Sequence, residues 1–374
     1  MKIAYCTNVR LPSERAHGHQ VARVTEALAL LGHTVTIFAP FRLNPITENF
    51  AGYHHLKADV TLRTLGSFDP ISSKLFPGVL GLWMLNWRMR TNLRTELHDF
   101  DLLYTRSPSL LPTFVRSTIP TVLELHSIPR RGTRFFVRLC NRCSLVVALT
   151  NVMASELKAI GVTAPIIVEG DAVDLELFAN AVPVTGHSTN EPLIVYAGQL
   201  ESMGLSKGIP ELLGALALLE EQKFPFRAVI AGGPEASRTR FVASMSPSLQ
   251  SRVTFTGLLP HSSIPALLKA ASVLVYPAPA SDHPFYRRDT SPLKLFEYAA
   301  SGRPIVAADL PPLRDVFDDS SVTFVRPGDA VSLAQGIGEA LKHPEKATKA
   351  FQATAKHTWT NRMQRIVAEI PVAA

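Results

Sequence analysis

The stretch Asp289-Thr-Ser-Pro-Leu-Lys-Leu-Phe-Glu297 runs on into Tyr-Ala-Ala-Ser-Gly302-Arg-Pro304-Ile-Val-Ala, so a loop, a helix and a strand are expected in turn. Ser291 is a good N-cap, and Pro292 suits the first helical position because its missing N–H costs nothing there. The free N–H groups of a first helical turn attract anions. Glu297 follows roughly 7–8 Å further along the helix. The segment therefore predicts a loop carboxylate, a phosphate site and a second carboxylate, which is the order of contacts that a nucleotide diphosphate carrying a sugar needs.

Length and charge limit the alternatives. A chain of 374 residues is too long for one ordinary domain and suits two of similar size. A hydrophobic content of 46% with 18% charged residues is typical of a globular protein with ample core. The formal charge of +7 favours anionic partners such as phosphates or an acidic lipid surface, although a bias that only aids solubility would look the same. Nucleic acid is not expected, because the basic residues are scattered rather than gathered beside stacking aromatics.

The cysteines and the N-terminus bear on the compartment. Cys6, Cys140 and Cys143 are too few for a disulfide framework, and no second pair accompanies the two-residue gap of Cys140 and Cys143. We expect ordinary buried thiols rather than a zinc or redox site. Residues 2–6 already read as a strand, with no signal peptide before them, and no apolar run approaches the ~20 residues that span a bilayer. A cytoplasmic location is expected.

The order of strands and helices predicts an α/β protein with two doubly wound parallel sheets. A strand at 2–6, a polar loop at 7–20, a helix and a strand at 34–38 form its first unit, and ligands of such sheets bind at the carboxyl ends of strands. The loop lacks GxGxxG, which argues against a dinucleotide cofactor. A polar linker at 180–191 separates two series of strands. We expect an N-terminal domain over 1–172, a C-terminal domain over 173–344 and a last helix, near 345–370 of the segment 345–374, that crosses back to the first domain.

Residues 72–97 are apolar and basic at once. Leu85, Met89, Leu93 and Leu97 form a stripe of period four, while Trp83 and neighbouring arginines suit a membrane interface. One interpretation is contact with an anionic membrane, which would place the protein peripherally on the inner face. The other is a helix that covers the sheet and has a solvated edge.

Several residues at strand ends are candidates for binding. Lys207 precedes Gly208 at a helix start and is a phosphate ligand by position, although an exposed lysine is the simpler explanation. Gly233 lies in a turn after a strand, where it could face the nucleotide or simply turn the chain. The backbone at Leu258 follows another strand and could meet a base. His126 ends a strand, where a neutral imidazole hydrogen-bonds a sugar hydroxyl, moves a proton or simply caps the loop. His17 and Arg106 are further candidates, on the acceptor side.

Together these segments resemble glycosyltransferase family 4, whose members are retaining enzymes with the GT-B fold of two Rossmann-like domains facing a central cleft. The resemblance covers almost the whole chain. It rests on these stretches: Ser291-Pro-Leu-Lys-Leu-Phe-Glu297 with Gly302-Arg-Pro304, Gly198 with Lys207-Gly208, Phe255-Thr-Gly257, Val273-Leu-Val-Tyr276-Pro277, Val173-Asp174-Leu-Glu-Leu-Phe178, and Arg15-Ala-His-Gly18 before a helix that ends in Gly32-His33.

The resemblance implies a role for each matching position. Glu297 would bind the ribose of the donor, and Asp289 stands where a glutamate contacts the transferred sugar. The backbone over Ser291, Pro292 and Leu293 would hold the diphosphate with Lys207, while Gly18 would lie in a loop that closes over the donor phosphates. His126 matches the histidine near sugar and acceptor. Asp289 is one methylene shorter than the family's glutamate, and Gln199 replaces an arginine, so Lys207 carries more of the charge stabilisation.

The function expected from these residues is transfer of a sugar from a nucleotide-diphosphate sugar to an acceptor hydroxyl with retention, in the synthesis of a glycan, a glycolipid or a cell-surface polysaccharide. The resemblance implies front-face substitution, with the leaving phosphate as the base. No Asp-x-Asp pair suits a metal-bound diphosphate, so neither an essential metal nor another cofactor is expected. The alternatives are a nucleotide-sugar 2-epimerase of similar fold and a non-catalytic protein that binds nucleotide sugars or an anionic surface.

Overall fold

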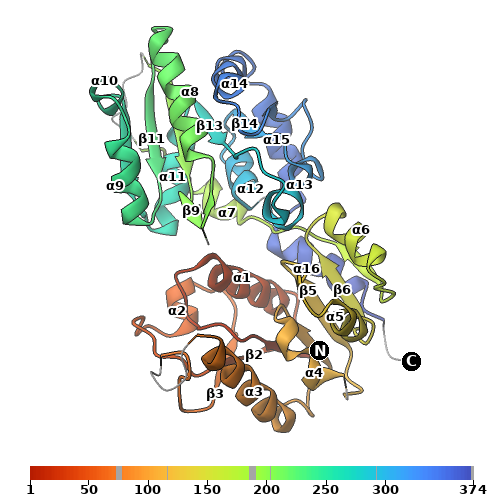
Figure 1. Cartoon of the computed structure of the whole chain (residues 1–374). Coiled ribbons are helices and arrows are strands. Elements are labelled where there is room, and N and C mark those ends of the chain that lie inside the picture. The colour runs from red at the N-terminus through yellow and green to blue at the C-terminus, as the bar shows by residue number, and fades with distance from the viewer. Residues whose placement is uncertain (73–77, 116, 185–190, 203, 292, 372–374) are drawn as a thin grey trace. The chain divides into compact units, whose positions relative to one another are not determined.

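The computed structural model describes residues 1–72, 78–115, 117–184, 191–202, 204–291 and 293–371. Its residue contacts divide the chain into two compact units. Unit 1 comprises Met1–Asp171 and Trp359–Ala374, and unit 2 comprises Ala172–Thr358. Each unit is an α/β sandwich built on one parallel sheet (Figure 1).

The sheet of unit 1 has the strand order β3-β2-β1-β4-β5-β6-β7, and every neighbouring pair is parallel. The order changes direction between β1 and β4, which makes this point the topological switch of the sheet. The strands are β1 (Lys2–Cys6), β2 (Thr34–Pro40), β3 (Thr61–Leu65), β4 (Leu102–Thr105), β5 (Thr121–Leu125), β6 (Leu145–Ala148) and β7 (Ile166–Val168).

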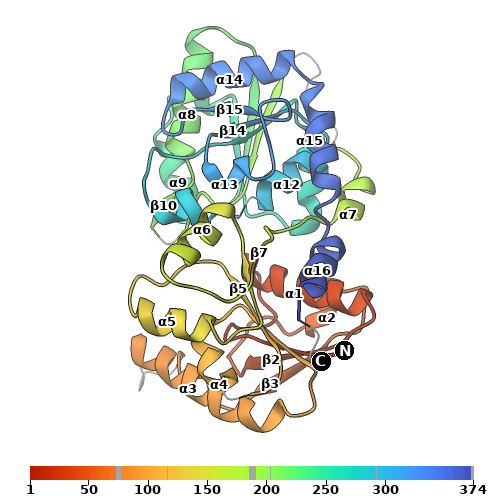
Figure 2. The ribbon, with the colours of Figure 1, turned by 90° about the vertical axis from the view of Figure 1, so that its right-hand side faces the viewer.

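Helices cover both faces of this sheet (Figure 2). On one side α1 contacts β2 and the C-terminal helix α16, and on the other α3, α4 and α5 pack over the apolar face of the sheet. They are α1 (Ala16–Leu30), α2 (Phe50–His54), α3 (Val79–Glu96), η1 (Pro108–Leu110), α4 (Leu111–Phe114), α5 (Thr133–Cys140), α6 (Asn151–Ala159) and α16 (Trp359–Ala368).

The sheet of unit 2 has the order β12-β11-β8-β13-β14-β15, again all parallel, with its switch between β8 and β13. A two-stranded antiparallel ribbon, β9 with β10, follows β8. The strands are β8 (Leu193–Ala197), β9 (Glu201–Ser202), β10 (Leu205–Ser206), β11 (Arg227–Ala231), β12 (Val253–Gly257), β13 (Val273–Tyr276), β14 (Ile305–Ala308) and β15 (Thr323–Val325).

Two apolar cores lie on the two faces of the second sheet. One packs residues of α7, α11, α12, α13 and α15 against it, and the other packs residues of α8, α9, α10 and α14. The helices are α7 (Leu175–Ala179), α8 (Ile209–Glu221), α9 (Glu235–Ala243), α10 (Pro247–Gln250), η2 (His261–Ser263), α11 (Ile264–Ala270), η3 (Phe285–Asp289), α12 (Leu293–Ala300), α13 (Pro311–Arg314), α14 (Ala330–Lys342) and α15 (Lys346–Ala355).

The strands expected at 2–6 and 34–38 correspond to β1 and β2, and the prediction of two doubly wound units is confirmed. The sequence reading missed β3 and α2. The strand β3 lies at the edge of its sheet and its side chains are exposed or half-buried, so it lacks the apolar run that marks an interior strand. The single helix expected over 345–370 is in fact two helices, α15 in unit 2 and α16 in unit 1. The linker residues 185–190 lie outside the described residues.

Two further expectations concern cysteines and membranes. Cys6, Cys140 and Cys143 are free and buried, as predicted. Within the part of the chain that the structure describes, no helix combines the length and the apolar character needed to cross a bilayer.

Candidate functional site

The strand ends at the switch point of unit 2 approach one another through glycines. Gly232 follows β11, and a Cβ at this position would lie 1.7 Å from the carbonyl oxygen of Gly198, the residue after β8. The Gly232 amide donates a hydrogen bond to the carbonyl of Gly257, 2.8 Å away, at the end of β12. These contacts leave no room for a side chain at Gly232. They expose backbone at the sheet edge where ligands of such folds bind.

Gly233 and Leu258, two predicted donor ligands, lie against each other. A Cβ at Gly233 would meet the Leu258 Cγ at 3.0 Å, so the glycine makes room for that side chain. The Leu258 side chain is otherwise 77% exposed. An exposed leucine beside open backbone offers an apolar surface on which a flat base could pack.

Lys207 lies in the loop between β10 and α8. Its ammonium lies 3.6 Å above the centre of the Phe285 ring, a cation–π contact. Burial lowers its pKa from 10.5 to about 8. Gly208 packs so closely that a Cβ there would lie 2.6 Å from the Ala278 amide nitrogen after β13. The loop therefore holds the Lys207 backbone close to the ends of β8 and β13.

Gln199, on the same loop, is exposed, and its backbone carbonyl accepts a hydrogen bond from the Tyr196 hydroxyl at 2.5 Å. No positive charge stands at this position. A positive group that sequence analysis did not assign, Lys294 of α12, lies beside it with its Nζ 3.2 Å from the Tyr196 hydroxyl.

Glu297, like Lys294, is on the helix α12. It is largely buried, with 14% of its side chain exposed. Its Oε1 is 3.1 Å from the Nε2 of His261, a residue of η2. This contact orients the carboxylate, and the sequence reading missed His261 because the two residues stand 36 positions apart.

Asp289 is bound by its own neighbour. Arg288 donates from Nε to Asp289 Oδ1 at 2.5 Å and from a terminal nitrogen to Oδ2 at 3.0 Å, with both side chains largely buried. The pair ends the π-helical turn η3. The carboxylate expected to contact a sugar is therefore partly neutralised by a bidentate arginine, which the sequence reading overlooked.

The predicted phosphate seat is described only in part. The helix α12 begins at Leu293, and Ser291 lies in the segment before it. Pro292 lies outside the described residues.

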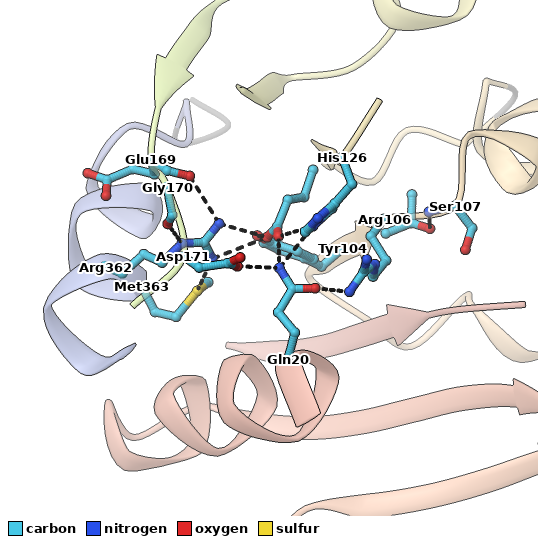
Figure 3. A network of polar contacts seen from close by, with 12 residues as sticks. Gln20, Tyr104, Arg106, Ser107, His126, Glu169, Gly170, Asp171, Arg362 and Met363 are labelled. Carbon is cyan, nitrogen blue, oxygen red and sulfur yellow. Dashed lines mark hydrogen bonds and ion pairs between the residues drawn. The ribbon is translucent and has the colours of Figure 1, made fainter. Parts of the chain in front are cut away.

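In unit 1, His126 belongs to a polar network at the ends of β4 and β5 (Figure 3). Its Nε2 lies 2.8 Å from Glu124 Oε1 and 2.9 Å from the side-chain nitrogen of Gln20. Burial and the charge of Arg106 lower the pKa of His126, although Glu124 acts in the opposite direction. The imidazole is therefore neutral at pH 7, with Nε2–H donated to Glu124 and Nδ1 left as an acceptor.

Gln20, on the first turns of α1, joins the members of this network. Its amide nitrogen donates to Glu124 and, at 3.2 Å, to Asp171 Oδ1, while its oxygen accepts from the guanidinium of Arg106. Arg106 therefore belongs to the network around His126, with its guanidinium bound to the side-chain amide of Gln20.

Glu124 is the buried anion of the network. Burial alone would raise its pKa, yet the guanidinium of Arg362 and the hydrogen bonds from His126 and Tyr104 outweigh that effect and hold the pKa well below its usual range. Arg362, from α16, lies 3.2 Å from Glu124 Oε2 and also donates to the Gly170 carbonyl at 2.6 Å. The C-terminal helix α16 therefore supplies the guanidinium that pairs with Glu124, the carboxylate to which His126 is bound.

His17 and Gly18 are in α1, not in a loop. The Gly18 amide donates to the Arg15 carbonyl at 2.8 Å, and a Cβ at Gly18 would lie 2.6 Å from the Ser13 carbonyl oxygen. The expectation of a loop at Gly18 is therefore wrong, because the helix begins at Ala16 and uses this amide internally. The His17 ring lies 3.5 Å from the Ser13 hydroxyl, and its pKa falls to about 4 through burial and the charge of Arg106.

Sequence signals differ among the residues that were missed. Glu124 is an acid inside the apolar strand Thr121–Leu125, and a charge in a strand buried on both faces signals a buried partner. Gln20, Asp171 and Arg362 carry no comparable signal, since only the fold brings them to that acid. No group of three or more His, Cys, Asp and Glu side chains suited to a metal ion is found among the described residues.

Comparisons with known proteins agree with this architecture. A family model described as Glycosyltransferase Family 4 matches residues 18–177, and one described as Glycosyl transferases group 1 matches residues 191–343. The 2-deoxystreptamine N-acetyl-D-glucosaminyltransferase of Streptomyces fradiae is 28% identical over 127 residues, which are 34% of this chain and 28% of that protein. The alpha-D-kanosaminyltransferase of Streptomyces kanamyceticus is 24% identical over 42% of this chain and 38% of its own length. The matched part thus spans well under half the length of these curated relatives.

A solved structure gives the same picture at the level of fold. HepE of Anabaena, solved with UDP and glucose, superposes with a TM-score of 0.68 at 20% identity, over 98% of both chains. At this identity the likeness concerns the fold.

Proposed function

We infer from these matches that the chain, which belongs to the family 4 glycosyltransferases with the GT-B fold, moves a sugar from a nucleotide-diphosphate sugar to an acceptor hydroxyl. The observation that carries this proposal is the strand-end site of unit 2. There Lys207 lies beside glycine-lined backbone, and Glu297 is held by His261 at the helix that follows. Lysine cations that could bind a diphosphate and a carboxylate that could bind a ribose thus lie at the same edge of the sheet. A nucleotide sugar needs both kinds of contact.

We assign the donor to unit 2 and the acceptor side to unit 1. Glu297 would accept hydrogen bonds from the ribose hydroxyls, and Lys207 with the backbone at Ser291 and Leu293 would bind the diphosphate. The exposed side chain of Leu258, with Gly233 beneath it, would support the base. His126 would offer its Nδ1 to a hydroxyl of the sugar or the acceptor, with His17 and Arg106 nearby on the same unit.

Retention is the stereochemical outcome that we propose. The carboxylate of Asp289 is paired with Arg288, which makes it a poor nucleophile for a covalent intermediate. In front-face substitution the bond between the anomeric carbon and the phosphate oxygen breaks, and the acceptor oxygen bonds to that carbon on the same face. The acceptor proton passes to the departing phosphate oxygen. Charge on the leaving diphosphate would be balanced by lysine ammonium groups, so we propose that no metal is essential.

The donor can be identified before the acceptor is known. A thermal-shift screen of UDP, GDP, ADP and dTDP, each with its sugars, should raise the melting temperature for one base, because a ligand of the native state stabilises it. HepE was solved with UDP, so UDP is the first choice. Transfer to glycan and lipid-linked acceptors is then followed, and proton NMR of the product reports the anomeric configuration. A wild-type protein that binds no nucleoside diphosphate would overturn the proposal.

One observation favours the non-catalytic alternative, namely the Arg288–Asp289 pair that occupies the expected sugar ligand. Donor binding without turnover on a broad acceptor panel would support a binding protein. Formation of an epimer from donor alone would instead identify an epimerase.

We also propose that unit 1 contacts an anionic membrane, at the inner face in the cytoplasm. The stripe Leu85, Met89, Leu93 and Leu97 is buried against the sheet, while Trp83 and Trp87 stack on the outer side of α3 and are about half exposed. Residues 73–77 of the predicted segment lie outside the described residues.

The helix α5 packs on the same face of the sheet as α3 and adds positive charge to this surface. Exposed Phe135 of α5 is accompanied by exposed arginines at positions 130, 131, 134, 138 and 142, with no acid between residues 125 and 155. Aromatic rings beside arginines suit the headgroup region of an acidic bilayer. A lipid-linked acceptor would be reached from such a surface.

A further inference from the structure

Lys294 also lies in the strand-end site of unit 2, and none of the roles proposed above involves it. It is the second residue of α12, and its Nζ lies 4.9 Å from the ring centres of both Tyr196 and Tyr276. A Cβ at Gly198 would lie 2.7 Å from Lys294 Cδ and 2.9 Å from Nζ. The lack of a side chain at Gly198 therefore makes space for this ammonium at the end of β8, beside the switch point of the sheet.

The ammonium is held in place by the neighbouring hydroxyl. Tyr196 donates its own hydrogen to the Gln199 carbonyl at 2.5 Å, so its oxygen is free to accept from Lys294 at 3.2 Å. Two aromatic faces support the charge in addition. One donor is used in this way, and an ammonium has three.

Lys294 and Lys207 form a pair of like charges. Among the residues that the structure describes, neither ammonium forms an ion pair with a carboxylate. Burial and, to a smaller extent, the charge of Lys207 lower the pKa of Lys294 to about 7, although Glu297 acts in the opposite direction. Two partly dehydrated cations that repel each other are costly, and a bound anion with several negative oxygens would remove that cost.

We propose that Lys294 is a ligand of the donor diphosphate and, with Lys207, stabilises the negative charge on the departing nucleoside diphosphate. This proposal rests on the proposed function. When the bond between sugar and phosphate breaks, the electron pair stays on the phosphate oxygen, and the Lys294 N–H groups donate to the diphosphate oxygens. Lys294 thereby supplies, from α12, the positive charge that position 199 lacks.

The test uses the full chain and compares Lys294→Met with Lys294→Arg. The matched control is Lys349→Met, which removes an exposed lysine of α15 in the same unit. Calorimetric titrations measure binding of the best nucleoside diphosphate from the screen and of its parent nucleoside. Thermal melting of each unliganded variant verifies its fold.

We expect Lys294→Met to weaken diphosphate binding about tenfold or more, because a hydrogen bond to a charged group is lost. Nucleoside binding should be unchanged, and both Lys294→Arg and Lys349→Met should stay within about threefold of wild type. Unchanged diphosphate affinity in Lys294→Met would overturn the proposal and leave the proposed function standing. An equal loss of nucleoside and diphosphate binding would also overturn it, because the effect would then not concern phosphate. A wild-type chain that binds no nucleoside diphosphate would refute the proposed function itself.

Discussion

Arg362 and Glu124 stand 238 positions apart in the chain, yet they form an ion pair at 3.2 Å with 1% and 0% of their side chains exposed. The pair joins the C-terminal helix α16 to the strand β5, which ends one residue before His126. A buried pair of this kind is costly to break, because removing one partner leaves an uncompensated charge in the interior.

Arg362→Met should therefore lower the free energy of unfolding by about 3–5 kcal/mol, as measured by urea denaturation. Arg365→Met on the same helix is the control. Its partner Glu169 is bound at 2.5 Å, but Arg365 is 39% exposed, so about 1 kcal/mol or less is expected. Equal losses for the two arginine variants would contradict the importance of burial.

His126→Ala should depress transfer far more than donor binding. The imidazole is neutral and presents Nδ1, so its loss removes a contact to the reacting groups and leaves the diphosphate site of unit 2 intact. We expect kcat to fall about 100-fold or more, the usual scale for a positioned proton-transfer or hydrogen-bonding group. Titration calorimetry should show an unchanged donor dissociation constant. Wild-type turnover would mean that His126 only caps its loop.

Glu297→Ala should raise the dissociation constant of the donor nucleotide about 10- to 100-fold, through the loss of charge-assisted hydrogen bonds to ribose. The comparison that isolates the ribose is binding of the 2′,3′-dideoxy nucleotide, which the variant should bind as well as wild type does. An exposed acid of the same unit, Glu339→Ala, serves as control. If the dideoxy nucleotide shows the same loss, the carboxylate acts elsewhere.

Diphosphate affinity should fall as the pH rises from 7 to 9. Only the protonated lysines bind an anion, and the free site has lowered pKa values, about 7 at Lys294 and about 8 at Lys207. The protonated form prevails below these values and is lost above them, so binding takes up protons across this range. A weakening of about threefold to tenfold between pH 7 and pH 8.5 is expected. Lys294→Arg, which stays charged, should flatten the profile, and an equally steep profile in that variant would argue against Lys294 as the titrating group.

Membrane contact is tested by co-sedimentation with liposomes. Wild-type protein should sediment with vesicles that contain phosphatidylglycerol, and not with phosphatidylcholine alone. Trp83→Ala/Trp87→Ala and Arg134→Ser/Arg138→Ser should each reduce the bound fraction severalfold, because they remove the aromatic and the cationic part of the surface. The control variant Lys349→Ser replaces an exposed lysine of unit 2 and should leave the bound fraction unchanged. Equal sedimentation with and without anionic lipid would exclude this contact.

Local patterns predicted most of the strands and the helix α12, because apolar runs and helix-start residues act over a few positions. They also placed Lys207, Gly233 and Leu258 near strand ends and Glu297 within the helix α12. They failed at Gly18, where only the extent of α1 shows that the amide is used within the helix. They failed again at Lys294, which looks like an ordinary exposed lysine until its side chain is seen to lie against Gly198.

The amino-acid sequence by itself determined the α/β class, the two sheets and the helix that starts within the segment 289–297, because periodicity and capping are local properties. The tertiary structure alone decided which charges meet. It paired Asp289 with Arg288, bound Glu297 to His261, brought Arg362 to Glu124 and placed Lys294 against Tyr196 and Tyr276. The physical reason is that the pKa of a side chain and its readiness to bind an anion depend on burial and on neighbours in space, most of which are distant in the chain.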